Sequence, residues 1–326
     1  MSDYHIPVLL DESVSALISD CNGCYADATF GGAGHTKEIL SRLGPEGRVI
    51  AFDRDSDAIG NAPDDSRLTL VRSNYRFIHN YILYMSRRHG HSWHPENIYG
   101  NTDRIRENGL DGILADLGVS SHQFDTPERG FSFRYDTALD MRMDSGTDIT
   151  AADIVNTYSE EDLARILWMY GEVDNSRKVA DLICRARKTE KICTTSQLDK
   201  AIGTALPKFA EHKALARIYQ ALRIEVNQEM KSLEQFLYGA ERSLKEGGRL
   251  VVITYHSLED RMVKNFIRTG NTEGRVERDL YGNTGAGMRA VNRKPTLPSE
   301  KEISGNTRAR SAKLRIAEKI WTPERQ

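Results

Sequence analysis

The sequence predicts an α/β fold, an open and mostly parallel sheet that is interrupted by an inserted helical domain. Two observations support this prediction. Short apolar segments alternate with helical ones as far as about residue 125, which is typical of a parallel sheet. Helical patterns then follow one another, before one more very apolar strand comes at 249–255. We therefore expect the α/β domain in two parts, residues 1–125 and 213–326, around an all-helical domain at 126–212.

The first part of the α/β domain is predicted from short apolar runs that end at turn residues or carboxylates. Segments with apolar residues at helical spacing separate these runs. The segment 89–108 is rich in His, Asn and Arg without a clear period, and we interpret it as a surface insertion. The expected strands are 25–30, 48–52, 68–71 and 111–116, and the expected helices are 35–43, 55–61 and 77–88.

The helical domain is followed by a return to the sheet. We expect Gly247 and Gly248 to cap the last long helix, and Ser257 to be the N-cap of the helix after the most apolar strand. Residues 270–305 are rich in Gly, Asn and Pro and predict a loop, and 313–317 alternates polar and apolar residues as an edge strand does. The expected helices are 151–156, 160–170, 175–188, 196–205 and 213–245.

The charge of the chain is unevenly distributed. The net charge is −2, yet residues 259–326 hold 15 Lys and Arg against 9 Asp and Glu. Such a basic tail is suited to binding a polyanionic partner. A solvated, mobile tail without a partner explains the same charge pattern equally well. The chain has no apolar run long enough to span a bilayer, no recognisable secretion leader and only four cysteines. We expect a cytoplasmic protein with no membrane partner.

A glycine-rich loop follows the first expected strand and indicates a cofactor site. It reads Thr29-Phe30-Gly31-Gly32-Ala33-Gly34-His35-Thr36 and leads into a helix. Backbone without Cβ atoms lets a ligand approach closely, and the helix N-terminus offers unpaired N–H groups. Asp53 ends the next strand, where a carboxylate can accept hydrogen bonds from ribose hydroxyls. The pattern predicts a nucleotide-like cofactor.

The loop and Asp53 alone leave two cofactors open, a nicotinamide dinucleotide and S-adenosylmethionine. The spacing Gly31-Gly32-Ala33-Gly34 departs from the dinucleotide fingerprint G-x-G-x-x-G. A second mononucleotide-binding half is also missing, because helices take its place in the sequence. Both observations favour S-adenosylmethionine over an oxidoreductase cofactor.

Several further motifs of this chain recur together, in the same order, in one known protein family. The chain closely resembles the bacterial 16S ribosomal RNA (cytosine-N4)-methyltransferase family over nearly its full length. Besides the glycine loop, the motifs are His5–Glu12 (HIPVLLDE), Phe52–Asp55 (FDRD), Asp116–Ser121 (DLGVSS), Arg129–Phe133 (RGFSF) with Leu139–Asp144 (LDMRMD), His256–Arg261 (HSLEDR) and Asn306–Ser311 (NTRARS).

The resemblance implies a class I S-adenosylmethionine methyltransferase fold, Rossmann-like and mostly parallel, with the inserted helical domain. It implies S-adenosylmethionine as cofactor and the N4 amine of a decoding-centre (P-site) cytidine in 16S rRNA of the small ribosomal subunit as target. A homodimer is left open. The cofactor contacts that the resemblance carries over are Ala33, Gly34, His35, Asp53, Asp116 and Gln123, with Tyr75 at a position that is commonly aromatic in the family.

Two residues are candidates for the chemistry. A cytosine amine is a poor nucleophile, so transfer needs a hydrogen-bond acceptor for the amine as positive charge builds on it. The chain has no Pro-Pro motif, and Asp116, or a backbone carbonyl beside it, stands at the equivalent strand end. His256 follows the most apolar strand and is the second candidate, for base binding or proton uptake. For His256, a structural role in which it is tied to Glu259 or Asp260 has the same weight as the catalytic role. For Asp116, a structural role as a carboxylate that fixes the loop has less weight than the catalytic role.

RNA recognition is expected to use charge and stacking. The expected phosphate contacts are Arg289, Arg293, Lys294, Arg308 and Arg310, and the expected stacking residues, unless they are core, are Phe131, Phe133 and Tyr135.

A zinc site is disfavoured. Cys21 and Cys24 form a C-x-x-C pair, and together with the histidines His89, His91 and His94 they could form a zinc site. The usual second cysteine pair is missing, so we expect no metal.

The leading function is an RNA base methyltransferase. A non-catalytic RNA-binding ribosome assembly factor and a nicotinamide oxidoreductase are the alternatives.

Overall fold

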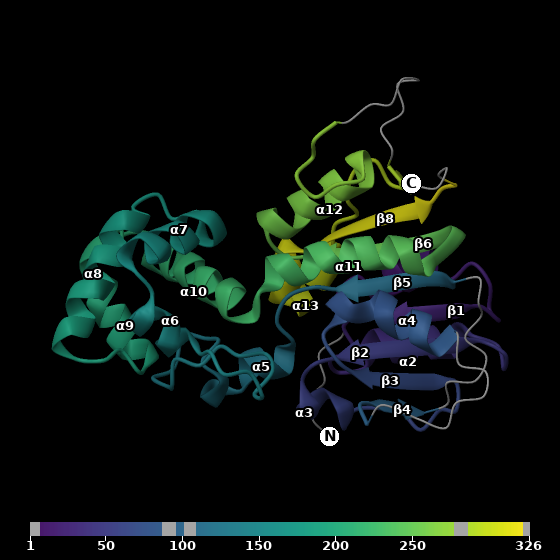
Figure 1. Ribbon diagram of the computed structural model, residues 1–326, viewed down its shortest axis with the longest axis horizontal. Coiled ribbons are helices and arrows are strands. Elements are labelled where there is room, and N and C mark those ends of the chain that lie inside the picture. Colours follow the sequence, from purple (N-terminus) through teal and green to yellow (C-terminus); the bar gives the residue numbers. More distant parts are fainter. Residues whose placement is uncertain (1–6, 87–95, 101–108, 277–285, 322–326) are drawn as a thin grey trace. The chain divides into compact units, whose positions relative to one another are not determined.

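The computed structural model describes residues 7–86, 96–100, 109–276 and 286–321. The chain divides into two compact units. One unit is an α/β unit formed by residues 1–118 and 230–326, and the other is a helical unit formed by residues 119–229. The α/β unit is thus built from both ends of the chain (Figure 1).

The α/β unit contains one eight-stranded sheet in the order β4-β3-β2-β1-β5-β6-β8-β7. The five strands β3, β2, β1, β5 and β6 run parallel, and β4, β8 and β7 pair with their neighbours antiparallel. The strands are β1 Cys24–Asp27, β2 Arg48–Asp53, β3 Leu68–Arg72, β4 Ile98–Gly100, β5 Leu110–Asp116, β6 Leu244–Thr254, β7 Met288–Ala290 and β8 Lys313–Lys319.

Helices cover the two faces of the sheet. Buried side chains of α4, α11 and α12 form one apolar cluster with the sheet, and those of α1 and α2 form another. The sheet strands are accordingly buried on both sides, as parallel strands usually are. The helices of this unit are α1 Leu10–Leu17, α2 Gly34–Arg42, α3 Ser56–Ile59, α4 Ile78–Ser86, α11 Glu229–Ser243, α12 Ser257–Thr269 and α13 Glu300–Gly305, with short 3₁₀ helices at Tyr75–Phe77 and Thr307–Ser311.

This arrangement confirms the predicted Rossmann-like, mostly parallel α/β fold, with two corrections within the sheet. The strand expected at 313–317 is not an edge strand, because β8 lies between β6 and β7 and its alternation reflects a half-buried position. The insertion expected at 89–108 contains β4, which pairs with β3. The rest of that insertion, residues 89–95 and 101–108, lies outside the described residues.

The helical unit has its own apolar core. Its helices are α5 Ser121–Asp125, α6 Ala151–Thr157, α7 Glu160–Gly171, α8 Ser176–Thr189, α9 Thr195–Ile202 and α10 Glu211–Asn227, with 3₁₀ turns at Pro127–Arg129 and Gly203–Ala205. The expected domain limits 126 and 212 both fall inside this unit, which runs from 119 to 229. The C-terminal limit differs because α10 buries Leu215, Ile218 and Leu222 in the helical core.

The single long helix expected at 213–245 is two helices in the structure. Gln228 adopts a left-handed backbone conformation, with φ of 49°, and separates α10 from α11. The second helix ends at Ser243, so Gly247 and Gly248 do not cap it. They lie within β6, where the pairing with β5 shifts register and Gly247 has φ of +76°. No described helix combines the length and the apolar content that crossing a membrane requires.

Candidate active site at the carboxyl ends of the strands

Three neighbouring parallel strands, β2, β1 and β5, end in aspartate. Asp53, Asp27 and Asp116 are the last residues of these strands. Because parallel strands end at the same edge of a sheet, the three carboxylates share the edge where α/β proteins bind ligands. The glycine loop leaves β1 at this edge and joins it to α2.

The loop folds tightly onto the start of α2. Gly31 has φ of +49°, and Ala33, the N-cap of α2, has φ of +64°. The Ala33 amide donates to the Phe30 carbonyl at 2.8 Å, which closes the turn. Gly34 lies against the N-terminal segment, since a Cβ at this position would come within 2.1 Å of Cγ of Pro7. Gly31 and Gly34 are therefore positions where the turn requires small residues, and the turn leads directly into the first N–H groups of α2.

Asp27 holds the loop by accepting hydrogen bonds from two of its residues. It is fully buried, and its Oδ1 accepts from the Thr29 amide at 3.1 Å while its Oδ2 accepts from the Thr36 hydroxyl at 2.6 Å. Burial raises the pKa of Asp27, and nearby His35 and the two threonines lower it in part. The loop is thereby bound to one buried carboxylate through its first and last residues.

Asp53 lies beside the loop and organises backbone. Its Oδ2 accepts from the Gly31 amide and its Oδ1 from the Asp55 amide, each at 2.8 Å. Burial raises the pKa of Asp53 to about 6, although these two hydrogen bonds lower it in part. Each carboxylate oxygen has a second lone pair, so Asp53 can still accept from two hydroxyl groups of a ligand.

Asp116 is contacted from two sides. The Tyr255 hydroxyl donates to its Oδ1 at 2.7 Å, and Nδ1 of His35 lies 3.8 Å from its Oδ2. The other ring nitrogen of His35 lies 3.3 Å from the Val8 carbonyl. Burial raises the pKa of Asp116 to about 6, against the lowering effect of His35 and Tyr255. A carboxylate with this pKa is ionised at neutral pH and is still a better proton acceptor than an ordinary aspartate.

Tyr75 lies in the 3₁₀ turn that follows β3. Its ring packs edge-on against Phe236 of α11, with centroids 5.2 Å apart. Its neighbour Asn74 donates through Nδ2 to the Ser232 hydroxyl of the same helix at 3.3 Å. The structure thus places Tyr75 on a fixed turn at the same edge of the sheet, and its contact with a cofactor stays a prediction.

Known proteins resemble the whole chain. A profile of the MraW methylase family matches residues 2–320. The chain belongs to the MraW methylase family. It is 54% identical over 316 residues to the ribosomal RNA small subunit methyltransferase H of Bacteroides fragilis, with 97% of each chain covered, and 50% identical over 318 residues to the protein of that name from Flavobacterium johnsoniae, with 98% of each covered. Among solved structures, NSun6 from Pyrococcus horikoshii with SFG has a TM-score of 0.41 at 11% identity, covering 97% of this chain and 53% of that one.

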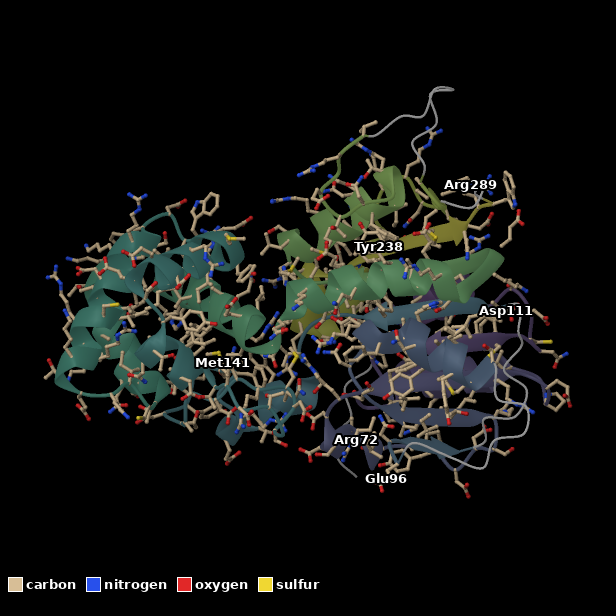
Figure 2. The ribbon with its side chains drawn as sticks, in the orientation of Figure 1. Arg72, Glu96, Asp111, Met141, Tyr238 and Arg289 are labelled. Carbon is tan, nitrogen blue, oxygen red and sulfur yellow. The ribbon has the colours of Figure 1, made fainter. Side chains whose placement is uncertain are left out.

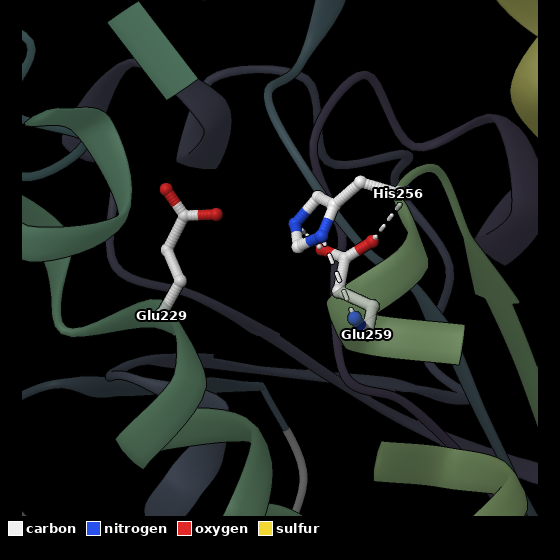
Figure 3. Close-up of side chains that lie close together, drawn as sticks. All are labelled: Glu229, His256 and Glu259. Carbon is white, nitrogen blue, oxygen red and sulfur yellow. Dashed lines mark hydrogen bonds and ion pairs between the residues drawn. The ribbon is translucent and has the colours of Figure 1, made fainter. Parts of the chain in front are cut away.

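His256, the second catalytic candidate in this MraW methylase, caps a helix. It is the N-cap of α12, in place of the expected Ser257. Its Nδ1 accepts from the Glu259 amide at 3.4 Å, and Nε2 lies 3.2 Å from Oε1 of Glu259 (Figure 3). Oε2 of Glu259 in turn accepts from the amides of Tyr255 and His256. The structural alternative for His256, a histidine tied to Glu259, is therefore present in the structure.

Gln123, the last expected cofactor contact, belongs to the helical unit. It is buried, and its Nε2 donates to the Met143 carbonyl at 3.3 Å. Met143 also donates its amide to Oδ1 of Asn227, at the end of α10, at 2.7 Å. These contacts explain how the helical unit holds Gln123, and its role toward a cofactor stays a prediction.

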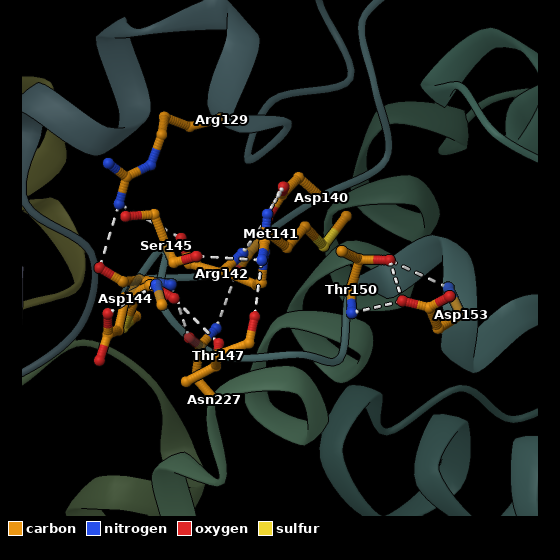
Figure 4. A network of polar contacts seen from close by, with 12 residues as sticks. Arg129, Asp140, Met141, Arg142, Asp144, Ser145, Thr147, Thr150, Asp153 and Asn227 are labelled. Atoms are coloured by element: carbon orange, nitrogen blue, oxygen red, sulfur yellow. Dashed lines mark hydrogen bonds and ion pairs between the residues drawn. The ribbon is translucent and has the colours of Figure 1, made fainter.

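The motif Leu139–Asp144 of this family is the centre of a polar network in the helical unit (Figure 4). Arg142 pairs with Asp140 at 2.7 Å and donates to the Thr147 carbonyl at 2.6 Å. Asn227 donates to the carbonyl of Met141, whose φ is 63°. The motif therefore stabilises the unit's own fold.

The expected RNA contacts have mixed outcomes. Phe131 is buried in the helical core and does not offer a stacking surface, whereas Tyr135 is exposed. Phe133 packs against Tyr219. Arg289, labelled in Figure 2, lies on β7, is 67% exposed and pairs with Glu318 at 2.7 Å.

Of the two cysteines in the disfavoured zinc site, Cys24 is buried in β1 and Cys21 is exposed, and the absence of a metal stays a prediction. The three histidines of that hypothesis lie outside the described residues.

Two residues at this edge, Asp27 and Tyr255, were not predicted from the sequence, and neither was the contact that the loop residue Thr29 makes with β5. Asp27 could have been found, since it stands two residues before the loop at a strand end. Thr29 accepts from the Asp116 amide at 2.7 Å and so joins the loop to β5. Tyr255 required knowledge that β6 lies next to β5, which is a long-range pairing.

Proposed function

We propose that this MraW methylase transfers a methyl group from S-adenosylmethionine to the N4 amine of a decoding-centre cytidine in small-subunit 16S ribosomal RNA. The proposal is supported by relatives that are named ribosomal RNA small subunit methyltransferase H and share about half of their residues with this chain over nearly its full length. The observation that carries the choice of chemistry is Asp116, a partly buried carboxylate at the carboxyl end of β5.

The residues of the α/β unit fit the cofactor. Among the described residues, a Cβ added to Gly31 would meet only the Thr29 carbonyl, at 3.9 Å, which leaves room for a ligand beside this glycine. Asp53 beside it keeps lone pairs for two ribose hydroxyls, and the start of α2 offers backbone N–H groups. Ala33, Gly34, His35, Tyr75 and Asp116 complete the proposed binding set in this unit.

S-adenosylmethionine, when bound, supplies an electrophilic methyl group on a positively charged sulfur. Asp116 serves the other reactant. The cytosine N4 becomes positively charged when it gains a fourth bond, and it returns to neutrality by losing a proton. The Asp116 carboxylate accepts that proton, and before transfer its negative charge orients the amine through a hydrogen bond. The cytidine has to leave its stack to reach this strand end.

The test is methyl transfer followed by mapping. We expect the protein to transfer labelled methyl groups from S-adenosylmethionine to 30S particles that lack the modification, and mapping to place the label on N4 of one decoding-centre cytidine. Asp116→Asn is the matched variant, and it should lose most of its turnover even when the cofactor and the RNA are saturating. Label on another nucleotide would contradict the target, and full turnover by Asp116→Asn would contradict its role.

The non-catalytic alternative predicts a different result in the same assay. An RNA-binding assembly factor would bind 30S particles and transfer no label. Running the assay on both naked 16S rRNA and assembled 30S particles separates the two substrates, since a chain that acts only on the particle will leave naked RNA unlabelled.

His256 is tested by a substitution that keeps the cap. Asparagine is a good N-cap residue, so His256→Asn should preserve the start of α12. If His256 takes part in base binding or proton uptake, this variant will lose turnover while its unfolding temperature stays close to that of the parent protein. Turnover equal to the parent's would leave His256 with the capping role alone.

A further inference from the structure

The Asp116 carboxylate is held by a side chain from the adjacent strand end. Tyr255 follows β6, and Asp116 stands opposite Ile253 in the β5–β6 pairing. The Tyr255 hydroxyl donates to Oδ1 of Asp116 at 2.7 Å. Within the described residues, Oδ2 of Asp116 accepts no hydrogen bond, since His35 Nδ1 at 3.8 Å is beyond that range. The two oxygens of this carboxylate are therefore not equivalent.

We propose that Tyr255 is a positioning residue for the methyl transfer: its hydroxyl fixes Oδ1 of Asp116, so that Oδ2 is the oxygen that accepts the proton of the substrate amine. This inference rests on the proposed function. A free carboxylate can rotate about its last bond, and a hydrogen bond to one oxygen restricts that rotation and selects the other oxygen for the reaction.

Tyr255 is itself held rigidly. Its amide donates to Oε2 of Glu259 at 2.8 Å, which ties it to the first turn of α12. Its ring lies against Gly118, where an added Cβ would come within 3.4 Å of Cδ2. The Leu117 amide donates to the Ile253 carbonyl at 3.0 Å and keeps the two strand ends together. These contacts hold the backbone and the ring of Tyr255 in the position from which its hydroxyl donates to Asp116.

Three elements and the segment between β6 and α12 contribute the groups that set the ionisation of Asp116. His35 of α2 and the Tyr255 hydroxyl lower its pKa, while Asp27 of β1 and Glu259 of α12 raise it, and burial has the largest effect and raises it. Burial and the charge of Asp116 raise the pKa of Tyr255 well above its usual value of 10. Tyr255 is therefore a neutral donor over the whole range of an enzyme assay, and it favours the ionised form of Asp116.

The experiment compares the pH dependence of kcat for the parent protein and Tyr255→Phe. Loss of a hydrogen bond to a charged group should move the midpoint of the acidic limb of the kcat–pH profile to a higher pH, by about one unit or more. We expect kcat to fall about tenfold at pH values below that limb, and to stay below the parent's value at pH 9 because Oδ2 of Asp116 is no longer fixed. The KM for S-adenosylmethionine should stay within about twofold.

A matched control removes the hydroxyl of another buried tyrosine of the same unit. The Tyr25 hydroxyl accepts from the amides of Ser19 and Asp20 and donates to the Asp20 carbonyl, so its hydrogen bonds do not involve Asp116. Tyr25→Phe should lower the unfolding temperature without moving the acidic limb. In an Asp116→Asn background, Tyr255→Phe should have little further effect on kcat, because the two residues act as a unit.

A readout without activity separates this inference from the proposed function. Carboxyl-carbon NMR of the labelled aspartates should show the pKa of Asp116 rising in Tyr255→Phe and not in Tyr25→Phe. If the parent protein transfers no methyl group but this shift occurs, the proposed function fails and the contact with Asp116 stands. If the parent is active and neither the limb nor the Asp116 pKa moves in Tyr255→Phe, the inference is overturned.

Discussion

Replacing Asp116 by asparagine should make the protein more stable at neutral pH, although it removes the proposed proton acceptor. Burial raises the pKa of Asp116 from 3.8 to about 6. Each unit of such a shift corresponds to 1.36 kcal/mol, so two units amount to about 3 kcal/mol. The Asp116 side chain is 23% exposed, and we reduce this figure to about 2 kcal/mol for solvent screening. Asparagine avoids the cost and still offers Oδ1 to the Tyr255 hydroxyl.

The sign of the effect follows from proton linkage. The folded state raises the pKa of Asp116, so it binds a proton more tightly than the unfolded chain does. The contribution of this group to stability is fully present below about pH 4 and is lost as the pH rises through 6. Asp116→Asn should therefore exceed the parent in stability by about 2 kcal/mol at pH 7, and this advantage should shrink toward zero at pH 4.

Calorimetric unfolding of both proteins between pH 4 and pH 8 measures this difference. For a unit of this size, one kcal/mol shifts Tm by about 2–4 °C. Asp65→Asn is a control of opposite sign, because the hydrogen-bonded ion pair with Arg67 lowers the pKa of Asp65. It should destabilise the protein at pH 7 and do so less as the pH falls. An Asp116→Asn protein that is less stable than the parent at pH 7, or whose difference does not depend on pH, refutes the reasoning.

Three further substitutions test the surroundings of the site. Asp53→Asn should weaken S-adenosylmethionine binding about tenfold or more in calorimetric titration, because an amide replaces one of two acceptor oxygens. Gly34→Ala should lower both Tm and cofactor affinity, since its Cβ would meet Pro7 at 2.1 Å, whereas Gly60→Ala, with only a backbone oxygen at 3.8 Å, should lower neither. Asp260→Asn should destabilise the protein at pH 7 in chemical unfolding. Burial would raise the pKa of Asp260, but ion pairs with β8 lower it overall, so this loss should vanish as the pH falls below about 4.

Much of the sheet could be predicted because each strand carries its own local pattern. The runs ending at Asp53 and Asp116 are apolar and bounded by turn residues, and both observed strands end at those residues. The site was predicted as far as it depends on strand ends and on the loop between them. The carboxylates follow from chain order, since parallel strands bring successive C-terminal ends to one edge.

The features that could not be predicted depend on long-range pairing or on unusual backbone. The break between α10 and α11 falls at Gln228, a residue with good helix propensity and no sequence mark of a left-handed conformation. The place of β8 inside the sheet depends on its pairing with β6 and β7. His256 as an N-cap was not expected, because histidine caps helices far less often than the serine beside it.

The strand-end aspartates are costly for folding, and the differences among them indicate their tasks. Asp27 has both oxygens bound by the loop residues Thr29 and Thr36, so it serves the shape of the loop. Asp53 binds two backbone amides and keeps lone pairs for a ligand. Asp116 keeps Oδ2 without a hydrogen bond from the described residues. With a pKa of about 6 it is about nine-tenths ionised at pH 7, and it is more basic than an exposed aspartate by about two pH units. The burial that makes its charge unfavourable for folding is therefore what makes it a suitable proton acceptor near neutral pH.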